Sequence, residues 1–244
     1  MNVEVVEVKD RLCVDVTHTR LYPGNSGIQR VVRGLVTTLR DNFDAVFFEV
    51  VNGNPRILES GEINTLVEWE KLAKKRDPKL KSLYRSSPAL VKKAFRLGRR
   101  CALRLRSTLK TPKESVINSV VLFQNCSLFL PELLDHARIA VYPSLCCLFQ
   151  RKIALLYDLI PISHPEYCVG DFSGNHVGYL KVLASSFDRV VGISQDASDV
   201  FRRYVNALGF PEPDIDAALL PFFEPSKSRD ILKGDSASVP EVVM

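Results

Sequence analysis

The sequence predicts an α/β domain built on a Rossmann-like, doubly wound sheet whose strands are mainly parallel. Short, nearly continuous apolar runs recur along the chain, and segments with the spacing of amphipathic helices lie between them. Such runs are typical of strands covered by helices on both faces, and right-handed crossovers then produce a doubly wound sheet. With 244 residues, of which 46% are hydrophobic, the chain has enough apolar surface for a full core.

The first strand is expected at residues 11–17, RLCVDVT, and the first helix at 27–40, GIQRVVRGLVTTLR. Apolar residues recur on one face of that helix at spacings of three and four. A second strand is expected at 43–51, FDAVFFEVV, and the letters NGNP after it predict a turn. The apolar helix positions are Ile28, Val31, Val32, Leu35, Val36 and Leu39.

The same alternation predicts the second half of the sheet. We interpret residues 1–224 as one domain that carries a basic helical insert at about 62–115, and residues 225–244 as a linker-like tail. The elements expected after the insert are a strand at 119–124, a helix from Pro131, a strand at 152–160, a helix at 175–187, a strand at 188–194, a helix at 195–208 capped by Ser194, and a last strand at 217–222.

The insert differs from its surroundings in charge. Residues 71–110 hold fifteen Lys and Arg and one acid, so the rest of the chain is acidic although the whole carries a net charge of +5. Residues 88–110 read as a basic amphipathic helix, which suits either an anionic membrane surface or a solvated face over a packed apolar stripe. Nucleic acid is disfavoured as a partner, because the helix has one aromatic residue and no recognised motif. The predicted membrane-contact residues are Lys92, Lys93, Arg96, Arg99, Arg100 and Arg104.

Composition excludes several other classes. The six cysteines include no CxxC pair and the four histidines show no zinc spacing, so neither a metal site nor a cofactor is expected. Scattered thiols fit a reducing cytoplasm. The first ten residues alternate Val with charge, unlike a signal peptide, and no apolar run reaches the length of a spanning helix. We expect a cytoplasmic protein, at the inner face of the membrane if the basic helix binds it.

The loop YPGNSGIQR, residues 22–30, places two glycines where a strand gives way to a helix. One interpretation is a turn, and the other is an anion site, because glycines let a phosphate approach the backbone and a helix N-terminus offers free N–H groups. The loop contains neither GxGxxG nor a P-loop motif. The residues of the predicted anion site are Gly24, Asn25, Ser26, Gly27 and Arg30.

Three segments in order resemble the N-terminal domain of GT-B glycosyltransferases, in particular the retaining family-four enzymes of bacterial polysaccharide synthesis, which often use mannose. They are DVTHTRLYPGNSGIQRVVRGLVTTL, ALLYDLIPISHPEYC and FDRVVGISQDASDVFRRY. The resemblance covers residues 11–50 and 119–223 and leaves out the insert. It implies that the loop 22–30 faces an interdomain cleft near the diphosphate of a nucleotide-sugar donor, such as GDP-mannose.

The resemblance also implies an acceptor side of the cleft. Asp158 would bind sugar hydroxyls, with a turn cap as its alternative role, and Ser194 would cap a helix or contact substrate. The family usually has His before the Asp, where this chain has Tyr157, so any role that requires an imidazole there is in doubt. Glu166 and Asp171 are not read as a glycosidase pair, because their sequence spacing does not establish the required separation. The acceptor-side residues are Asp158, His164, Glu166, Tyr167 and Ser194, and no catalytic residue is assigned.

In this family a second Rossmann-like domain binds most of the donor and usually carries two glutamates with seven residues between them. Glu62 and Glu70 have that spacing but precede the basic insert, so we interpret them as coincidence. Only about twenty residues follow LLPFFEPS. The sequence therefore predicts the acceptor-side half of a glycosyltransferase that uses a glycan or lipid-linked acceptor and needs a second domain or subunit. The alternative is a non-catalytic binding module or an inactive fragment.

Overall fold

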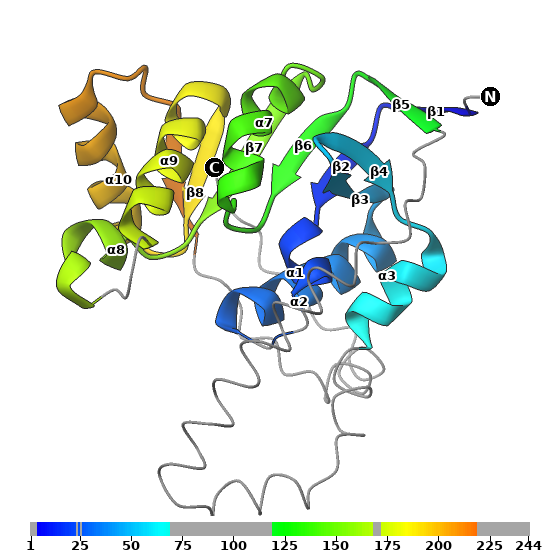
Figure 1. Ribbon diagram of the computed structural model, residues 1–244, viewed down its shortest axis with the longest axis horizontal. Helices are drawn as coiled ribbons and strands as arrows, with labels where there is room; N and C mark the ends of the chain where they lie inside the picture. Colours follow the sequence, from blue (N-terminus) through cyan, green and yellow to red (C-terminus); the bar gives the residue numbers. More distant parts are fainter. Residues whose placement is uncertain (1–3, 23, 25, 69–118, 168–171, 219–244) are drawn as a thin grey trace, which may run out of the picture.

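The structure, a computed structural model, describes residues 4–22, 24, 26–68, 119–167 and 172–218. These residues form a seven-stranded sheet with strand order β4-β3-β2-β6-β7-β8-β9 (Figure 1). Every neighbouring pair is parallel except β3 and β4, which form an antiparallel hairpin. The predicted α/β class with a Rossmann-like, mainly parallel sheet is therefore confirmed.

The strands are short, and helices connect most of them. The strands are β1 (Glu4–Lys9), β2 (Leu12–Asp15), β3 (Ala45–Val51), β4 (Asn54–Ile57), β5 (Ser119–Gln124), β6 (Ser127–Leu130), β7 (Arg151–Leu156), β8 (Arg189–Gly192) and β9 (Asp214–Ala217). The helices are α1 (Thr17–Leu21), α2 (Gly27–Asn42), α3 (Ser60–Val67), α7 (His136–Cys146), α8 (Ile160–Ser163), α9 (Phe172–Ser186) and α10 (Gln195–Leu208), with a 3₁₀ turn, η1, at Pro165–Tyr167.

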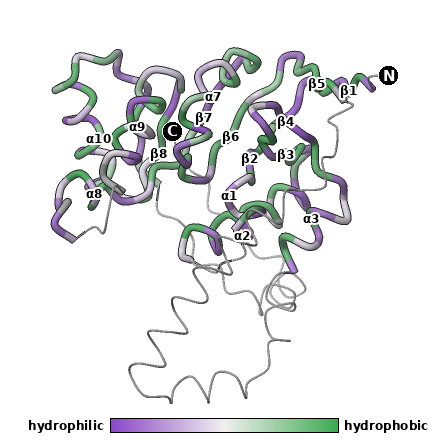
Figure 2. The backbone as a smooth tube through the Cα atoms, in the orientation of Figure 1, coloured by the Kyte–Doolittle hydropathy of each residue, from purple (hydrophilic) through white to green (hydrophobic). Residues whose placement is uncertain are grey.

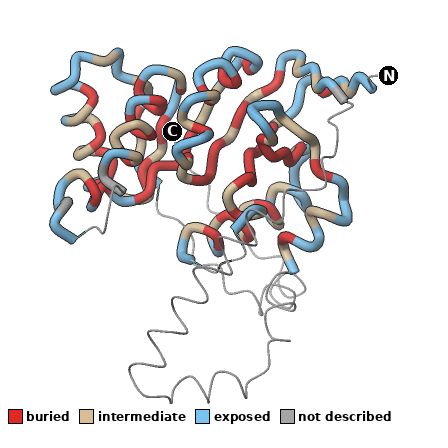
Figure 3. The backbone as a smooth tube through the Cα atoms, in the orientation of Figure 1, coloured by how far each residue is buried: buried red, intermediate tan, exposed pale blue. Residues whose placement is uncertain are grey.

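Two hydrophobic cores lie on the two faces of the sheet. Adjacent strand residues belong to different cores: Phe47 belongs to the core that includes residues of α2 and α3, whereas Phe48 belongs to the core that includes residues of α7, α9 and α10. This division follows from the alternation of side chains along a strand. Hydrophobic and hydrophilic residues alternate along α2 and α10 (Figure 2), and buried residues concentrate along the central strands (Figure 3).

The strand order has a topological switch point between β2 and β6. From β2 the chain crosses to β3 on one side, and from β6 it proceeds through β7, β8 and β9 on the other side. In doubly wound sheets, ligands bind beyond the carboxyl ends of the strands at such a point. The loops that follow β2, β6, β7 and β8 all leave this edge, because these strands are parallel.

Strands β1 and β5 extend β2 and β6 beyond the main sheet as a two-stranded parallel arm (Figure 1). The register between the two chain segments is the same before and after the interruption. Asp10 and Asn125 face each other at the break, and both have positive φ, a conformation that Asp and Asn adopt more readily than most residues. A matched kink in both strands therefore separates the arm from the sheet.

Several predicted elements differ from the observed ones. Helix α7 begins after Asp135, which caps it, and not at Pro131. The sequence analysis placed no strand at residues 127–130, where β6 lies, or at residues 4–9, where β1 lies. Strand β9 ends at Ala217, where the last strand was expected to begin. The predicted basic helix at 88–110 and the tail lie outside the described residues. Within the described part of the chain, no helix has the length and apolar character needed to cross a membrane.

Gly192, the last residue of β8, should be required for the close approach of α10. A Cβ atom at this position would lie 3.0 Å from the backbone oxygen of Ser194 and 3.0 Å from the nitrogen of Ser198, and closer still to the Ser198 hydroxyl. We expect Gly192→Ala to lower the free energy of unfolding by about 2 kcal/mol, measured by urea denaturation. The control is Gly61→Ala in α3, where a Cβ meets no atom within 4 Å. It should be neutral or stabilising by about 0.5 kcal/mol. Equal effects of the two substitutions would contradict this account.

Candidate functional site

The predicted site residues lie in loops at the carboxyl edge of the sheet. Gly24 and Gly27 follow β2 and α1, Asp158 follows β7, and Ser194 follows β8. The parallel pairing of these strands places their carboxyl ends at one edge. Among the described residues, no hydrogen bond or ion pair joins the glycine loop to Asp158 or Ser194, so a shared binding site stays a prediction.

Side chains of α2 hold the loop that precedes it. Ser26 and Gln29 form a reciprocal capping box. The backbone N–H of Gln29 donates to Ser26 Oγ, and the backbone N–H of Ser26 donates to Gln29 Oε1. Gln29 Nε2 donates to the Tyr22 carbonyl at 2.6 Å, and Arg33 Nη2 donates to the Gly24 carbonyl at 3.0 Å. A Cβ at Gly24 would meet Gln29 Oε1 at 2.5 Å, so a larger residue there would displace the Gln29 side chain from the capping box. The loop is thus an ordered entrance to a helix, as the turn interpretation expects.

The other residues of the predicted anion loop are more open. A Cβ on Gly27 would meet no atom within 4 Å, and Arg30 is exposed on α2. A larger side chain at position 27 would therefore extend into free space beside the first turn of α2. Asn25 lies outside the described residues. The anion-binding role of this loop remains a hypothesis.

Asp158 and Tyr157 point in opposite senses at the end of β7. Asp158 is exposed, and its Oδ1 accepts the Ile160 N–H at 3.3 Å, which is the turn-capping role considered above. Tyr157 is buried, and its hydroxyl donates to the Pro131 carbonyl at 2.7 Å. Burial raises the pKa of Tyr157, so it does not exchange protons near neutral pH. His176 on α9 is buried close to Asp158, and burial lowers its pKa although the neighbouring Asp158 charge favours the protonated imidazole.

His164, Glu166 and Tyr167 form a small exposed group around η1. His164 Nδ1 lies 3.3 Å from Glu166 Oε1, and the rings of His164 and Tyr167 have their centroids 5.7 Å apart. Tyr167 is 75% exposed. These contacts are local in sequence, and none reaches the glycine loop or Ser194. Asp171 lies outside the described residues.

Ser194 is the N-cap of α10. Its Oγ accepts the Ala197 N–H at 3.1 Å, and the helix ends at Gly209 in the left-handed conformation. The predicted capping role is therefore present in the structure. A contact from Ser194 to substrate stays untested.

The sequence analysis missed a buried group of charges at the switch point, which lies beside these loops. It consists of Asp15 at the end of β2, Glu132 after β6 and Arg138 on α7. Arg138 Nη1 lies 3.3 Å from Asp15 Oδ2 and 3.6 Å from Glu132 Oε2. One guanidinium is thus shared by two carboxylates, both of which have no solvent exposure.

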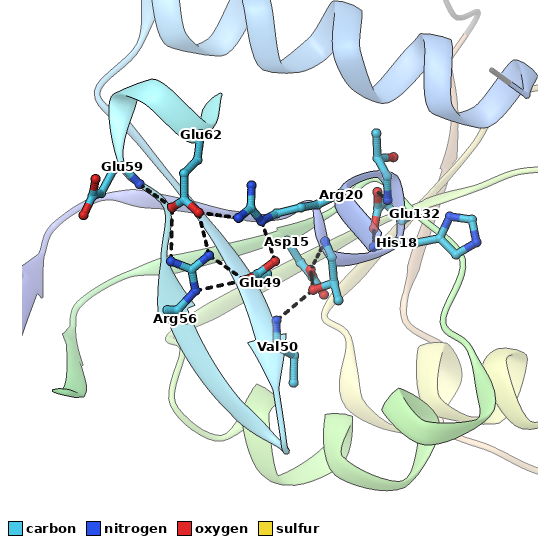
Figure 4. A network of polar contacts seen from close by, with 11 residues as sticks. Asp15, His18, Arg20, Glu49, Val50, Arg56, Glu59, Glu62 and Glu132 are labelled. Atoms are coloured by element: carbon cyan, nitrogen blue, oxygen red, sulfur yellow. Dashed lines mark hydrogen bonds and ion pairs between the residues drawn. The ribbon is translucent and has the colours of Figure 1, made fainter. Parts of the chain in front are cut away.

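Each member of this group has further hydrogen bonds. Asp15 Oδ2 accepts the Tyr142 hydroxyl at 2.7 Å, and Asp15 Oδ1 accepts the Thr17 N–H at 2.8 Å. Glu132 accepts the His18 N–H at 2.6 Å and the Thr19 N–H at 2.7 Å, so it caps α1 (Figure 4). These bonds meet the requirement that buried polar groups be satisfied.

Burial and the neighbouring charges shift the pKa values of Glu132, Arg138 and His18. Burial, together with the nearby Asp15 charge, raises the pKa of Glu132 to about 7. Burial opposes the charge on Arg138, but Asp15 and Glu132 keep its pKa above the ordinary value. Burial and the Arg138 charge lower the pKa of His18. His18 is therefore neutral at physiological pH, whereas Glu132 gains or loses its proton close to physiological pH.

A second charged network fixes the other side of α1. Arg20 Nε donates to Glu49 Oε2 at 2.6 Å and its Nη2 pairs with Glu62, while Arg56 bonds to both glutamates (Figure 4). Hydrogen bonds from Arg56 lower the pKa of Glu62 despite its partial burial. Glu62 therefore joins α3 to α1, β3 and β4. Its expected lack of a donor-binding role is not tested, and Glu70 lies outside the described residues.

The described residues contain no group of three or more His, Cys, Asp or Glu side chains arranged to hold a metal ion. The predicted membrane-contact residues of the insert lie outside the described part of the chain. No protein-family model matches the chain, and no curated protein matches it at a significant level.

The raised pKa of Glu132 should make the stability of the chain depend on pH. Between about pH 4.5 and pH 7 the folded chain retains a proton at Glu132 that the unfolded chain releases. The contribution of Glu132 to the free energy of unfolding is therefore greatest below about pH 4.5 and falls as the pH rises to about 7. We expect Glu132→Gln to remove this slope, so that the wild type loses stability relative to the variant between about pH 5 and pH 7.

Urea denaturation at several pH values checks this expectation. Glu212→Gln is the control, because Glu212 is an exposed carboxylate paired with Arg202 and far from the switch point in the strand order. Its stability should follow that of the wild type across the range. Parallel curves for the wild type and Glu132→Gln would show that Glu132 does not gain a proton on folding.

Proposed function

We propose that the chain is the acceptor-side domain of a GT-B-type glycosyltransferase that works with a donor-binding second domain or subunit. The observation that carries the proposal is the position of the three resembling segments. Each begins in or near a strand of the parallel sheet, β2, β7 or β8, and continues into a loop at the same carboxyl edge. Such loops converge on one crevice in doubly wound sheets.

The proposed roles follow from the chemistry of each loop. The first turn of α2, entered through Gly24 and Gly27, offers N–H groups and open space to the diphosphate of a nucleotide sugar. The exposed carboxylate of Asp158 accepts hydrogen bonds from acceptor hydroxyls while its Oδ1 retains the Ile160 N–H. His164, Glu166, Tyr167 and Ser194 border the acceptor side. The buried Tyr157 takes no part in proton transfer.

A non-catalytic binding module is the second candidate. The observation that favours it is that Asp158 and Ser194 both already have structural roles as caps. A transferase predicts sugar transfer once a donor-binding domain is supplied, whereas a binding module predicts glycan binding without transfer. The two candidates share the acceptor-binding edge, so that edge is tested first.

Asp158→Asn should weaken the binding of glycan acceptors without unfolding the loop. Asparagine keeps an oxygen for the Ile160 N–H but loses the negative charge. We expect affinity for lipid-linked or free oligosaccharides to fall roughly tenfold, as for the loss of a charged hydrogen bond, in isothermal titration calorimetry. Asp41→Asn is the control, because Asp41 is an exposed carboxylate near the end of α2, at the opposite edge. Equal affinities for the wild type and Asp158→Asn would refute the acceptor role.

We also propose that the basic segment 88–110 brings the domain to anionic membranes, where lipid-linked acceptors reside. Each Lys or Arg near such a surface contributes about 1 kcal/mol at best. We expect co-sedimentation with anionic vesicles, weakening as salt rises, and loss of binding when Arg99, Arg100 and Arg104 are changed to Glu. Equal binding to neutral and anionic vesicles would exclude an electrostatic contact.

A further inference from the structure

Helix α1 is a short helix that polar contacts hold on its inward side. Glu132 binds the N–H groups of His18 and Thr19, and Thr17 Oγ1 accepts the Val50 N–H at 2.8 Å. On the other side, Arg20 pairs with Glu49 and Glu62. Contacts from β3, α3 and the loop after β6 therefore fix this five-residue helix beside the switch point.

The outward side of α1 is aromatic and apolar. The rings of His18 and Tyr22 lie with their centroids 4.7 Å apart at an angle of 37°. Tyr22 is 52% exposed and Leu21 is 55% exposed. Figure 4 shows the His18 ring pointing away from the charged networks. Large exposed apolar side chains on a well-anchored helix, at the ligand-binding edge of a doubly wound sheet, indicate a binding site.

The charges around α1 indicate the chemical class of that occupant. Arg20 is paired with two carboxylates and Arg138 with three, so neither of these arginines beside the helix offers an unpaired cation to a phosphate. His18 is uncharged at neutral pH because burial and Arg138 lower its pKa. An electrically balanced aromatic surface suits an uncharged ligand that has one apolar face. A pyranose ring has such a face, formed by its C–H groups, with hydroxyls at its rim.

We propose that the His18–Tyr22 pair is a stacking platform for an uncharged sugar ring. The C–H face of the sugar lies against the aromatic faces, and the Tyr22 hydroxyl remains at the rim for a sugar hydroxyl. The proposal rests on the proposed function in one respect, because it assigns the platform to the acceptor. The binding itself requires no donor domain and no transfer.

Amide chemical shifts of the isotope-labelled chain test the platform. Neutral trisaccharides of mannose, glucose and galactose are titrated, with inorganic pyrophosphate and GDP as charged comparators. We expect at least one trisaccharide to shift the amide signals of α1 more than either charged probe does. Tyr22→Ala should weaken its binding roughly five- to tenfold, as for the loss of a stacking contact, and Tyr22→Phe should retain most of the affinity.

Phe43→Ala is the matched control. Phe43 is a 60% exposed aromatic residue just after α2, at the opposite edge of the sheet. Its substitution should leave sugar binding unchanged. Every Tyr22 variant keeps the backbone carbonyl that binds Gln29, and thermal unfolding confirms that the loop is intact. The platform would be overturned if no sugar shifted the amide signals of α1, or if pyrophosphate or GDP shifted them more than the sugars do. It would also be overturned if Phe43→Ala reduced sugar affinity as much as Tyr22→Ala does, or if Tyr22→Phe did so.

The Asp158→Asn variant separates this proposal from the proposed function. Sugar binding that is lost in Tyr22→Ala and kept in Asp158→Asn supports the platform and refutes the role given to Asp158. Sugar binding that is lost in Asp158→Asn and kept in Tyr22→Ala overturns the platform and leaves the acceptor-side function in place. Loss in both variants supports one binding surface that spans both loops.

Discussion

One guanidinium shared by two buried carboxylates connects the elements on which the carboxyl edge depends. Asp15 ends β2, Glu132 follows β6 and Arg138 lies on α7. Removing Arg138 would leave two buried carboxylates without the cation that they share, which costs several kcal/mol. The group is tolerated because most of its other polar atoms have hydrogen-bond partners, as in the bond from Arg138 Nη2 to the Leu133 carbonyl at 2.6 Å. The ends of the two central strands and the start of α7 are therefore fixed relative to one another.

The same group also changes what the switch point can bind. In many doubly wound proteins a phosphate from outside binds to the N–H groups of the helix that follows the first strand. Here the carboxylate of Glu132 binds the first N–H groups of α1. An external anion would have to compete with a side chain of the chain itself. This favours the next helix, α2, for the proposed diphosphate contact, and leaves the outer side of α1 for an uncharged group.

The fold class was predictable because it depends on local patterns. Helix α10 lies at the predicted residues 195–208, and β3 and β7 fall within predicted apolar runs. Strand β6 was missed because it is four residues long and because the kink at Asn125 separates it from β5. The shared charges were missed for another reason. Asp15 and Arg138 are 123 residues apart, so no local spacing reveals their contact. The one local signal is the acid itself, in the apolar run RLCVDVT.

The edge of the sheet on which the site residues lie was predictable from topology, but the direction of each side chain was not. Successive strand residues point to opposite sides, and a shift of one residue at the end of β7 exchanges the inward and outward positions. Tyr157 takes the inward position and its hydroxyl donates to the Pro131 carbonyl, so the position at which the enzymes that the sequence resembles usually have His has a structural role in this chain. Imidazoles reach the carboxyl edge from other elements, His164 before η1 and His18 on α1. His164 is exposed, and its side chain pairs with Glu166, a close neighbour in sequence. His18 is half-buried, and its backbone N–H is held by Glu132. A ring held in this way keeps one orientation before any ligand arrives, which reduces the entropic cost of binding.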